Sequence, residues 1–177
     1  MTPGEIERLA LEIRRKTTMD VLPVPVEKIA RMLGMKIQPA DLGDEVSGVL
    51  VIEGGQTIIG VNADHPEVRQ RFTIAHEIGH FILQHHTHTD LFVDDGDFLA
   101  VYRRDNPRSR DNKRERDANT FAGALLMPKD VLERELGSRS LGLFDDPDWK
   151  ALAERFDVSR QALLIRLTKL GFFGPSY

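Results

Sequence analysis

Two histidines and a glutamate lie close together in this chain, with the spacing of a metal site. His76, Glu77 and His80 form the pattern His-Glu-x-x-His. Residues four apart on a helix share one face, so both imidazoles could bind the same ion. Zn²⁺ takes nitrogen ligands at about 2.0–2.1 Å in tetrahedral geometry. A carboxylate directly after the first ligand, here Glu77, can act as general base toward the attacking water.

The neighbours of this pattern favour a functional metal site over a chance match. They are mainly apolar and comprise Phe72, Ile74, Ala75, Ile78, Phe81, Ile82 and Leu83. A helix that is apolar on nearly all sides is buried in the protein. Buried polar groups without partners are costly, and a bound cation would give the two histidines and the glutamate such a partner. We therefore expect a buried metal helix over residues 72–85.

A second stretch supplies the third protein ligand that a catalytic zinc site needs beside its open position. Residues 115–127 predict a helix that ends before Pro128. Its core-facing residues are Ala118, Phe121, Ala122 and Leu125. Glu115 lies at the start of the same face, so we expect it to be a buried carboxylate that binds the metal. Asn119, one turn later, either hydrogen-bonds a ligating histidine or lies on the helix surface.

Composition limits the chemistry and the partners of this chain. Its 177 residues contain no cysteine, so metal ligands must be histidines and carboxylates. The net charge of −4 gives no general attraction to nucleic acid or to an anionic membrane. No stretch has the length of a membrane span, and acidic residues interrupt the N-terminus, which argues against a signal peptide. We therefore expect a cytoplasmic protein with no membrane partner.

The remaining patterns predict helices around a small sheet. Helical spacing and capping residues indicate helices over residues 2–16, 25–33, 146–156 and 159–170, and β-rich runs indicate strands over 35–37, 47–52 and 57–61. Glu53-Gly54-Gly55-Gln56 predicts a hairpin, whose edge could pair with an extended substrate. The expected fold is α+β, mainly helical with a small antiparallel sheet. We expect a main domain at residues 1–140 and a helix-turn-helix-like tail, packed on it, at 141–177.

Three runs of residues together resemble the ImmA/IrrE family of bacterial zinc metallopeptidases. They are Val61-Asn62, the run from Arg71 to His80, and the run from Glu115 to Pro128, which follows the family pattern Glu-x-x-Ala-Asn-x-Phe-Ala-x-x-Leu-Leu-x-Pro. The resemblance covers roughly residues 25–171 and implies a zincin-like metallopeptidase core in the main domain. It also implies that His76, His80 and Glu115 are the metal ligands and that Glu77 is the catalytic base. Asp117 stands where the family usually has glutamate or glutamine, a departure that does not affect the proposed ligands.

The resemblance also implies a substrate, namely a helix-turn-helix transcriptional repressor that is cut in response to stress or damage. We therefore expect a zinc-dependent endopeptidase, although a His₂Glu site could also hold Mn²⁺ or Fe²⁺. Some relatives carry an additional N-terminal DNA-binding domain or C-terminal sensor domain, and we expect neither here. The residue that stabilises the oxyanion stays open, with His85, His86, His88, Tyr102 and Tyr177 as candidates.

Two other functions stay open at this point. In the first, the protein is a non-proteolytic DNA- or repressor-binding regulator with a structural metal, for which a loop histidine would supply the fourth ligand. In the second, it is the toxin component of a toxin–antitoxin pair. Arg160, Arg166 and Lys169 of the tail could contact DNA phosphates. The acidic net charge argues against direct DNA binding, so we interpret the tail as a packing or repressor-docking unit.

Overall fold

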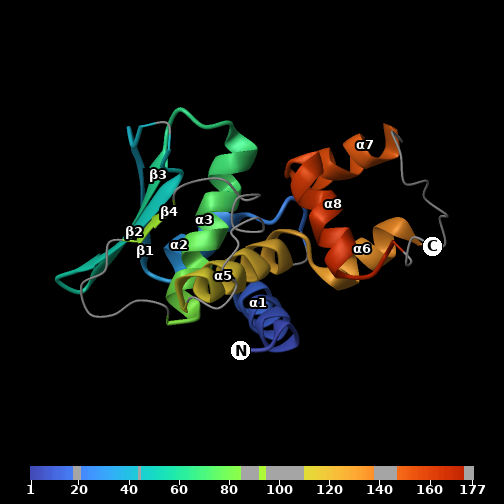
Figure 1. Ribbon diagram of the computed structural model, residues 1–177, viewed down its shortest axis with the longest axis horizontal. Coiled ribbons are helices and arrows are strands. Elements are labelled where there is room, and N and C mark those ends of the chain that lie inside the picture. Colours follow the sequence, from blue (N-terminus) through green and yellow to red (C-terminus); the bar gives the residue numbers. More distant parts are fainter. Residues whose placement is uncertain (18–20, 44, 85–91, 95–109, 138–146, 174–177) are drawn as a thin grey trace.

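The computed structural model describes residues 1–17, 21–43, 45–84, 92–94, 110–137 and 147–173. Seven helices and four strands are assigned within these ranges (Figure 1). In chain order they are α1 (Pro3–Thr17), α2 (Val26–Met32), β1 (Met35–Ala40), β2 (Gly48–Glu53), β3 (Gln56–Asn62), α3 (Glu67–Ile82), β4 (Phe92–Asp94), α5 (Arg110–Leu126), α6 (Lys129–Leu136), α7 (Pro147–Phe156) and α8 (Arg160–Lys169). The mainly helical α+β fold expected from the sequence is confirmed.

The sheet has the strand order β1-β3-β2-β4. The predicted hairpin is present between β2 and β3, and its two central glycines, Gly54 and Gly55, have φ values of 56° and 77°. Two successive positive φ values are what a tight hairpin turn requires, and glycine adopts them without steric cost. β4 extends the sheet by pairing antiparallel with β2.

One expectation about the sheet was wrong. β1 runs parallel to β3, so the sheet is mixed rather than wholly antiparallel. The possibility that the hairpin pairs with substrate is narrowed: β1 lies beside β3 and β4 pairs with Gly48 to Leu50 of β2, so among the described residues of β2 only Val51 to Glu53 have a side without a neighbouring strand. Strand and turn patterns predict local pairing, whereas the direction and position of β1 depend on a crossover from one side of β3 to the other.

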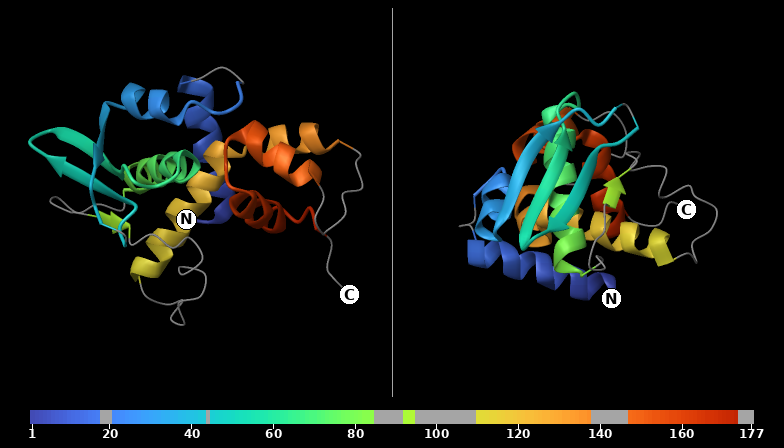
Figure 2. Two further views of the ribbon diagram at one scale, coloured as in Figure 1. Left: turned by 90° about the horizontal axis from the view of Figure 1, so that it is seen from above. Right: turned by 90° about the vertical axis from the view of Figure 1, so that its left-hand side faces the viewer.

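Helix α3 lies at the centre of the molecule, between the sheet and α5. It packs against β2 and β3 on one side and against α5 on the other, and α5 in turn packs on α1. Figure 2 shows α3 directly behind the sheet, with α5 crossing it. Ile74, Ala75 and Ile78 are almost fully buried, as their apolar surroundings predicted. Because α3 is covered on both sides, its polar residues His76, Glu77 and His80 are removed from bulk water.

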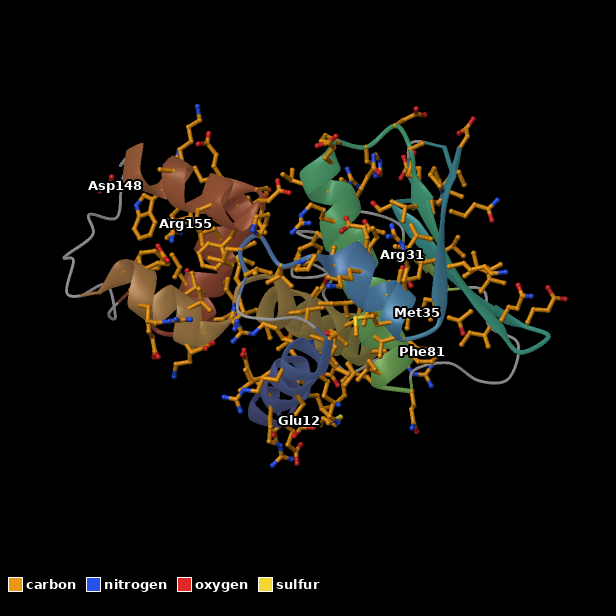
Figure 3. The ribbon with its side chains drawn as sticks, turned by 180° about the vertical axis from the view of Figure 1, so that it is seen from behind. Glu12, Arg31, Met35, Phe81, Asp148 and Arg155 are labelled. Carbon is orange, nitrogen blue, oxygen red and sulfur yellow. The ribbon has the colours of Figure 1, made fainter. Side chains whose placement is uncertain are left out.

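The C-terminal residues form a helix pair that packs on the rest of the chain. α7 and α8 are joined by a tight turn, in which Ser159 caps α8 by accepting a hydrogen bond from the Ala162 amide at 3.1 Å. Asp148 and Arg155, labelled in Figure 3, lie on α7, on the opposite side of the molecule from the sheet. Buried side chains of α7 and α8 belong to the same hydrophobic cluster as those of α1, α3 and α5. The division at residue 140 stays a prediction.

Two buried arginines hold this helix pair in place. Arg71 of α3 forms an ion pair with Asp157 in the turn at 2.9 Å and donates to the Val24 carbonyl at 2.9 Å. Arg166 of α8 is 3% exposed, donates to the Met127 carbonyl at 3.1 Å and forms a two-point ion pair with Glu7 of α1. Arg166 is therefore not available to contact DNA phosphates, a possibility that the sequence left open, because its guanidinium is already bound inside the protein.

Replacing Arg166 should destabilise the fold. In Arg166→Met, Glu7 loses its ion pair and the Met127 carbonyl loses a donor, which we expect to lower the free energy of unfolding by about 2 kcal/mol. Urea denaturation followed by circular dichroism measures this change. Lys150→Met is the matched control, because Lys150 is 80% exposed and should change stability by less than about 0.5 kcal/mol. Equal stabilities of the two variants would contradict the proposed anchoring role.

Candidate metal centre

The metal centre depends on the close approach of α3 and α5. A Cβ atom built on Gly79 of α3 would lie 3.2 Å from the Ala118 Cα, 3.2 Å from the Ala118 carbonyl oxygen and 3.2 Å from Phe121 Cδ1 of α5. Such distances are tighter than ordinary van der Waals contact, so the two helix backbones approach closely only because residue 79 is glycine. Glu115 lies one turn before Ala118, and His80 directly follows Gly79. The contact therefore brings the predicted ligands of both helices together.

The three predicted ligands form a compact triangle. His76 Nε2 lies 3.2 Å from Glu115 Oε2, His80 Nε2 lies 3.3 Å from Glu115 Oε1, and the two Nε2 atoms are 2.9 Å apart. A tetrahedral Zn²⁺ with bonds of about 2.0–2.1 Å places its ligand atoms roughly 3.3 Å from one another. These three side chains can therefore hold a metal ion, and their donor set of two imidazoles and a carboxylate suits zinc.

The charge state of Glu115 is also suited to a metal site. Burial acts to raise the pKa of this carboxyl group, but hydrogen bonds and charge interactions with His76 and His80 outweigh burial and hold the pKa far below its usual range. Glu115 is therefore ionised at neutral pH, which is the form that binds a cation. Glu115 lies beside the two histidines as expected, but its side chain is 28% exposed rather than buried, and its role as a metal ligand stays a prediction.

Asn119 fixes the orientation of the first histidine. Its side chain is 5% exposed, and its Oδ1 lies 3.0 Å from His76 Nδ1. The amide oxygen can only accept, so Nδ1 carries the proton and donates it to Asn119, which leaves the lone pair of Nε2 for the metal. Of the two possibilities that the sequence left open for Asn119, the structure shows the contact with His76, whose role as a metal ligand stays a prediction.

Glu77 is fully buried and lies beneath the beginning of β2. Its side chain is 0% exposed, and a Cβ atom built on Gly48, the first residue of β2, would lie 3.4 Å from its Oε1. A carboxylate in such a site is shielded from bulk water. Its position beside His76 agrees with the predicted role, which stays a prediction.

Other candidate residues differ in how far the structure addresses them. His85, His86, His88, Tyr102 and Tyr177 lie outside the described residues, so the oxyanion-stabilising group and any fourth histidine ligand stay open. Within the described ranges, no helical segment combines the length and hydrophobicity that a membrane span requires. Gly48, Gly79 and Ala118 are site-forming residues that the sequence interpretation missed. Glycine within a helix costs about 1 kcal/mol relative to alanine, so Gly79 carried a signal of close packing.

Fold and site together define a class of protein, namely α+β domains built around a buried His-Glu-x-x-His helix with a candidate metal site. Within this class, the model of the IrrE N-terminal-like domain family (Peptidase_M78) matches residues 30–168. This match covers most of the chain, so the protein belongs to that family, and the resemblance to ImmA/IrrE proteins is confirmed. Membership suggests metallopeptidase activity. No curated protein matches the chain.

A solved structure supports the fold independently. The chain is similar to a Mycobacterium tuberculosis transcriptional regulator, with a TM-score of 0.63 and 18% sequence identity. The similarity covers 93% of this chain and 46% of the regulator, so this chain spans about half the length of that protein. At this identity the likeness shows a shared fold and does not transfer the regulator's role.

Loss of the Asn119 contact should weaken metal binding. In Asn119→Ala, His76 loses the acceptor that fixes its tautomer, and we expect the affinity for Zn²⁺ to fall roughly 10–100-fold. Competition with a chromophoric chelator measures the dissociation constant. Thr120→Ala is the matched control, because Thr120 is the next residue on α5 and its hydroxyl bonds the Arg116 carbonyl, away from the ligand triangle. An unchanged zinc affinity in Asn119→Ala would remove Asn119 from the site.

Proposed function

We propose that this protein is a zinc-dependent endopeptidase that cleaves a helix-turn-helix transcriptional repressor. The observation that carries the proposal is the triangle of His76, His80 and Glu115, with ligand atoms 2.9–3.3 Å apart. Glu77, which directly follows His76 in the sequence, is fully buried. Three protein ligands of this kind leave a fourth position for water or substrate, as in catalytic zinc sites. Zinc is the first choice of metal for two histidines and a carboxylate, with Mn²⁺ and Fe²⁺ as alternatives.

Each residue of the centre has a part in peptide hydrolysis. Zn²⁺ held by His76, His80 and Glu115 would make water more acidic and would polarise the scissile carbonyl group. Glu77 accepts the proton that the attacking water loses as its oxygen bonds to the carbonyl carbon. Glu77 then donates this proton to the amide nitrogen, so that the carbon–nitrogen bond breaks and the amine departs. Asn119 keeps His76 oriented with Nε2 toward the ligand triangle.

The repressor substrate is proposed from the family resemblance. The solved structure with the same fold is described as a transcriptional regulator, which agrees with a role near gene control but is a statement about that protein. In this proposal, residues 1–140 form the metallopeptidase domain and the tail at 141–177 docks the repressor. Because repressors act in the cytoplasm, the enzyme is expected there too.

Co-incubation with a repressor tests this function directly. The zinc-loaded protein is mixed with the helix-turn-helix repressor encoded nearest to it, and separately with a library of peptides derived from a bacterial proteome. Mass spectrometry identifies cut bonds with and without the chelator 1,10-phenanthroline. Chelator-sensitive cuts support an endopeptidase. Repressor binding without any cut favours the regulator, and growth arrest that a neighbouring protein relieves favours the toxin.

The general base can be separated from the metal ligands by one substitution. Glu77→Gln preserves the size of the side chain but cannot accept the proton, so kcat should fall roughly 10²–10⁴-fold. Zinc content, measured by atomic emission, should stay at one ion per chain, because Glu77 is not among the ligands. Cleavage at the wild-type rate by Glu77→Gln would reject the assigned role.

The third ligand has its own test. Glu115→Ala removes the only carboxylate of the ligand triangle among the described residues, and we expect zinc to be lost on dialysis against a mild chelator. Asp117→Ala, two positions along the same helix, should retain zinc, because Asp117 bonds Lys113 rather than the histidines. Full zinc occupancy in Glu115→Ala would place the third ligand elsewhere.

A further inference from the structure

One face of α3 lies directly against the beginning of β2. The residues on this face, Arg69, Thr73 and Glu77, are each four positions apart and therefore follow one another along the helix. The Arg69 guanidinium donates to Ser47 Oγ from Nε at 3.1 Å and from Nη2 at 2.8 Å. Ser47 is 2% exposed and immediately precedes β2. This helix face, which runs from Arg69 to Glu77, is therefore attached to the sheet through Arg69.

Gly48 is the point of closest approach between this face and the sheet. A Cβ atom at Gly48 would lie 2.3 Å from Thr73 Cγ2, 3.2 Å from the Gly60 carbonyl oxygen and 3.4 Å from Glu77 Oε1. A distance of 2.3 Å between two carbon atoms is a severe overlap. The backbone of Gly48 has no positive φ, so the need for glycine here comes from space and not from conformation.

The strand cannot easily move away from the helix. Gly48 is aligned with Val61 of β3 on one side and with Asp94 of β4 on the other, so its segment is held within the sheet. Thr73 is 2% exposed and Glu77 is 0% exposed, so the helix side of the contact is tightly packed as well. In a close-packed interior, an added methyl group displaces its neighbours. Here the overlapping neighbour is Thr73, whereas Glu77 Oε1, at 3.4 Å, would be in ordinary van der Waals contact. Displacement of Thr73 would shift the helix one turn before Glu77, and this shift would carry the carboxylate with it.

We propose that Gly48 is a positioning residue for Glu77, because its missing side chain lets β2 lie on α3 and so sets where the carboxylate stands relative to the ligand triangle. The proposal rests on the endopeptidase function for the role of Glu77, although the position of the carboxylate can be measured without it. A shift of about 1 Å in a reacting group can cost on the order of 10²-fold in rate.

The test combines Gly48→Ala with a substitution that makes room for the new methyl group. Gly48→Ala should lower kcat on the order of 10–100-fold, with KM and zinc affinity close to wild type. Thr73→Ser removes Cγ2, the atom that the new methyl would overlap, so the double variant Gly48→Ala/Thr73→Ser should recover to within about threefold of Thr73→Ser alone. The substrate is the peptide that wild-type protein cuts fastest in the library.

Gly60→Ala is the matched control. Its Cβ would lie 2.6 Å from Val49 Cγ1, so it also crowds the sheet, but the three atoms nearest to it all belong to Val49 rather than to α3. This variant should lose stability, measured by thermal denaturation, while its kcat stays within about threefold of wild type. A fall in kcat equal to that of Gly48→Ala would mean that any disturbance of the sheet slows cleavage, and would overturn the proposal.

Further outcomes decide between the proposal and its alternatives. A double variant as slow as Gly48→Ala would overturn the positioning role, because relief of the overlap would not restore the rate. If Gly48→Ala alone does not fold, the double variant is compared with Thr73→Ser in the same way, and failure of the double variant to fold also overturns the proposal.

If wild-type protein cuts nothing, the proposed function fails, and crystal structures of the zinc-loaded proteins then test the positioning role of Gly48. Displacement of the Glu77 carboxylate in Gly48→Ala and its return in the double variant support the proposal, and an unmoved carboxylate rejects it.

Discussion

The approach of α3 and α5 at Gly79 and Ala118 is the contact on which the metal centre depends. Two histidines on one helix can be placed by helical spacing alone, but the carboxylate must come from elsewhere in the chain. Glu115 reaches both imidazoles because its helix crosses α3 with almost no side chain between the two backbones. In the run Glu115-x-x-Ala118-Asn119, the candidate ligand therefore lies one helical turn before the residue at the helix contact and the orienting amide, which are adjacent.

Polar groups at this contact stand in an otherwise apolar interior. Ile78 and Phe121 are fully buried beside them, and His76 and His80 are 2% and 1% exposed. A divalent ion bound by His76, His80 and Glu115 would give all three groups one shared partner in this interior. Local chemistry that is unfavourable for folding alone is typical of functional sites.

Much of this site could be predicted from the sequence because its information is local. The i, i+4 spacing of His76 and His80 and the apolar periodicity after Glu115 both report on single helices. The sequence could not decide whether Asn119 contacts a histidine or lies on the helix surface, because the answer depends on how α5 is oriented relative to α3. The sequence left open whether Arg166 is buried or contacts DNA, for a related reason. Its ion-pair partner, Glu7, lies 159 positions away, and no local pattern distinguishes a buried arginine from a phosphate-binding one.

Helix α6 and the direction of β1 show the same limit. α6 begins directly after Pro128, a residue that was interpreted only as the end of α5, although proline also starts helices at their first turn. β1 could be recognised as a strand, but its parallel pairing with β3 depends on how the chain crosses the sheet. Local patterns specify the elements well, and the contacts between distant elements then decide which face of each is buried.

The two buried arginines connect the C-terminal helices to the metal helix in a way that bears on partner binding. Arg71 lies on α3 five positions before His76, and it holds the turn between α7 and α8 through Asp157. Arg166 joins α8 to α1 and to the C-terminal end of α5. A helix pair fixed at both ends cannot swing as a separate DNA-reading unit would. The effect of a protein that binds this pair would instead be transmitted through these arginines to α3 and α5. These two helices together carry His76, His80, Glu115 and Asn119.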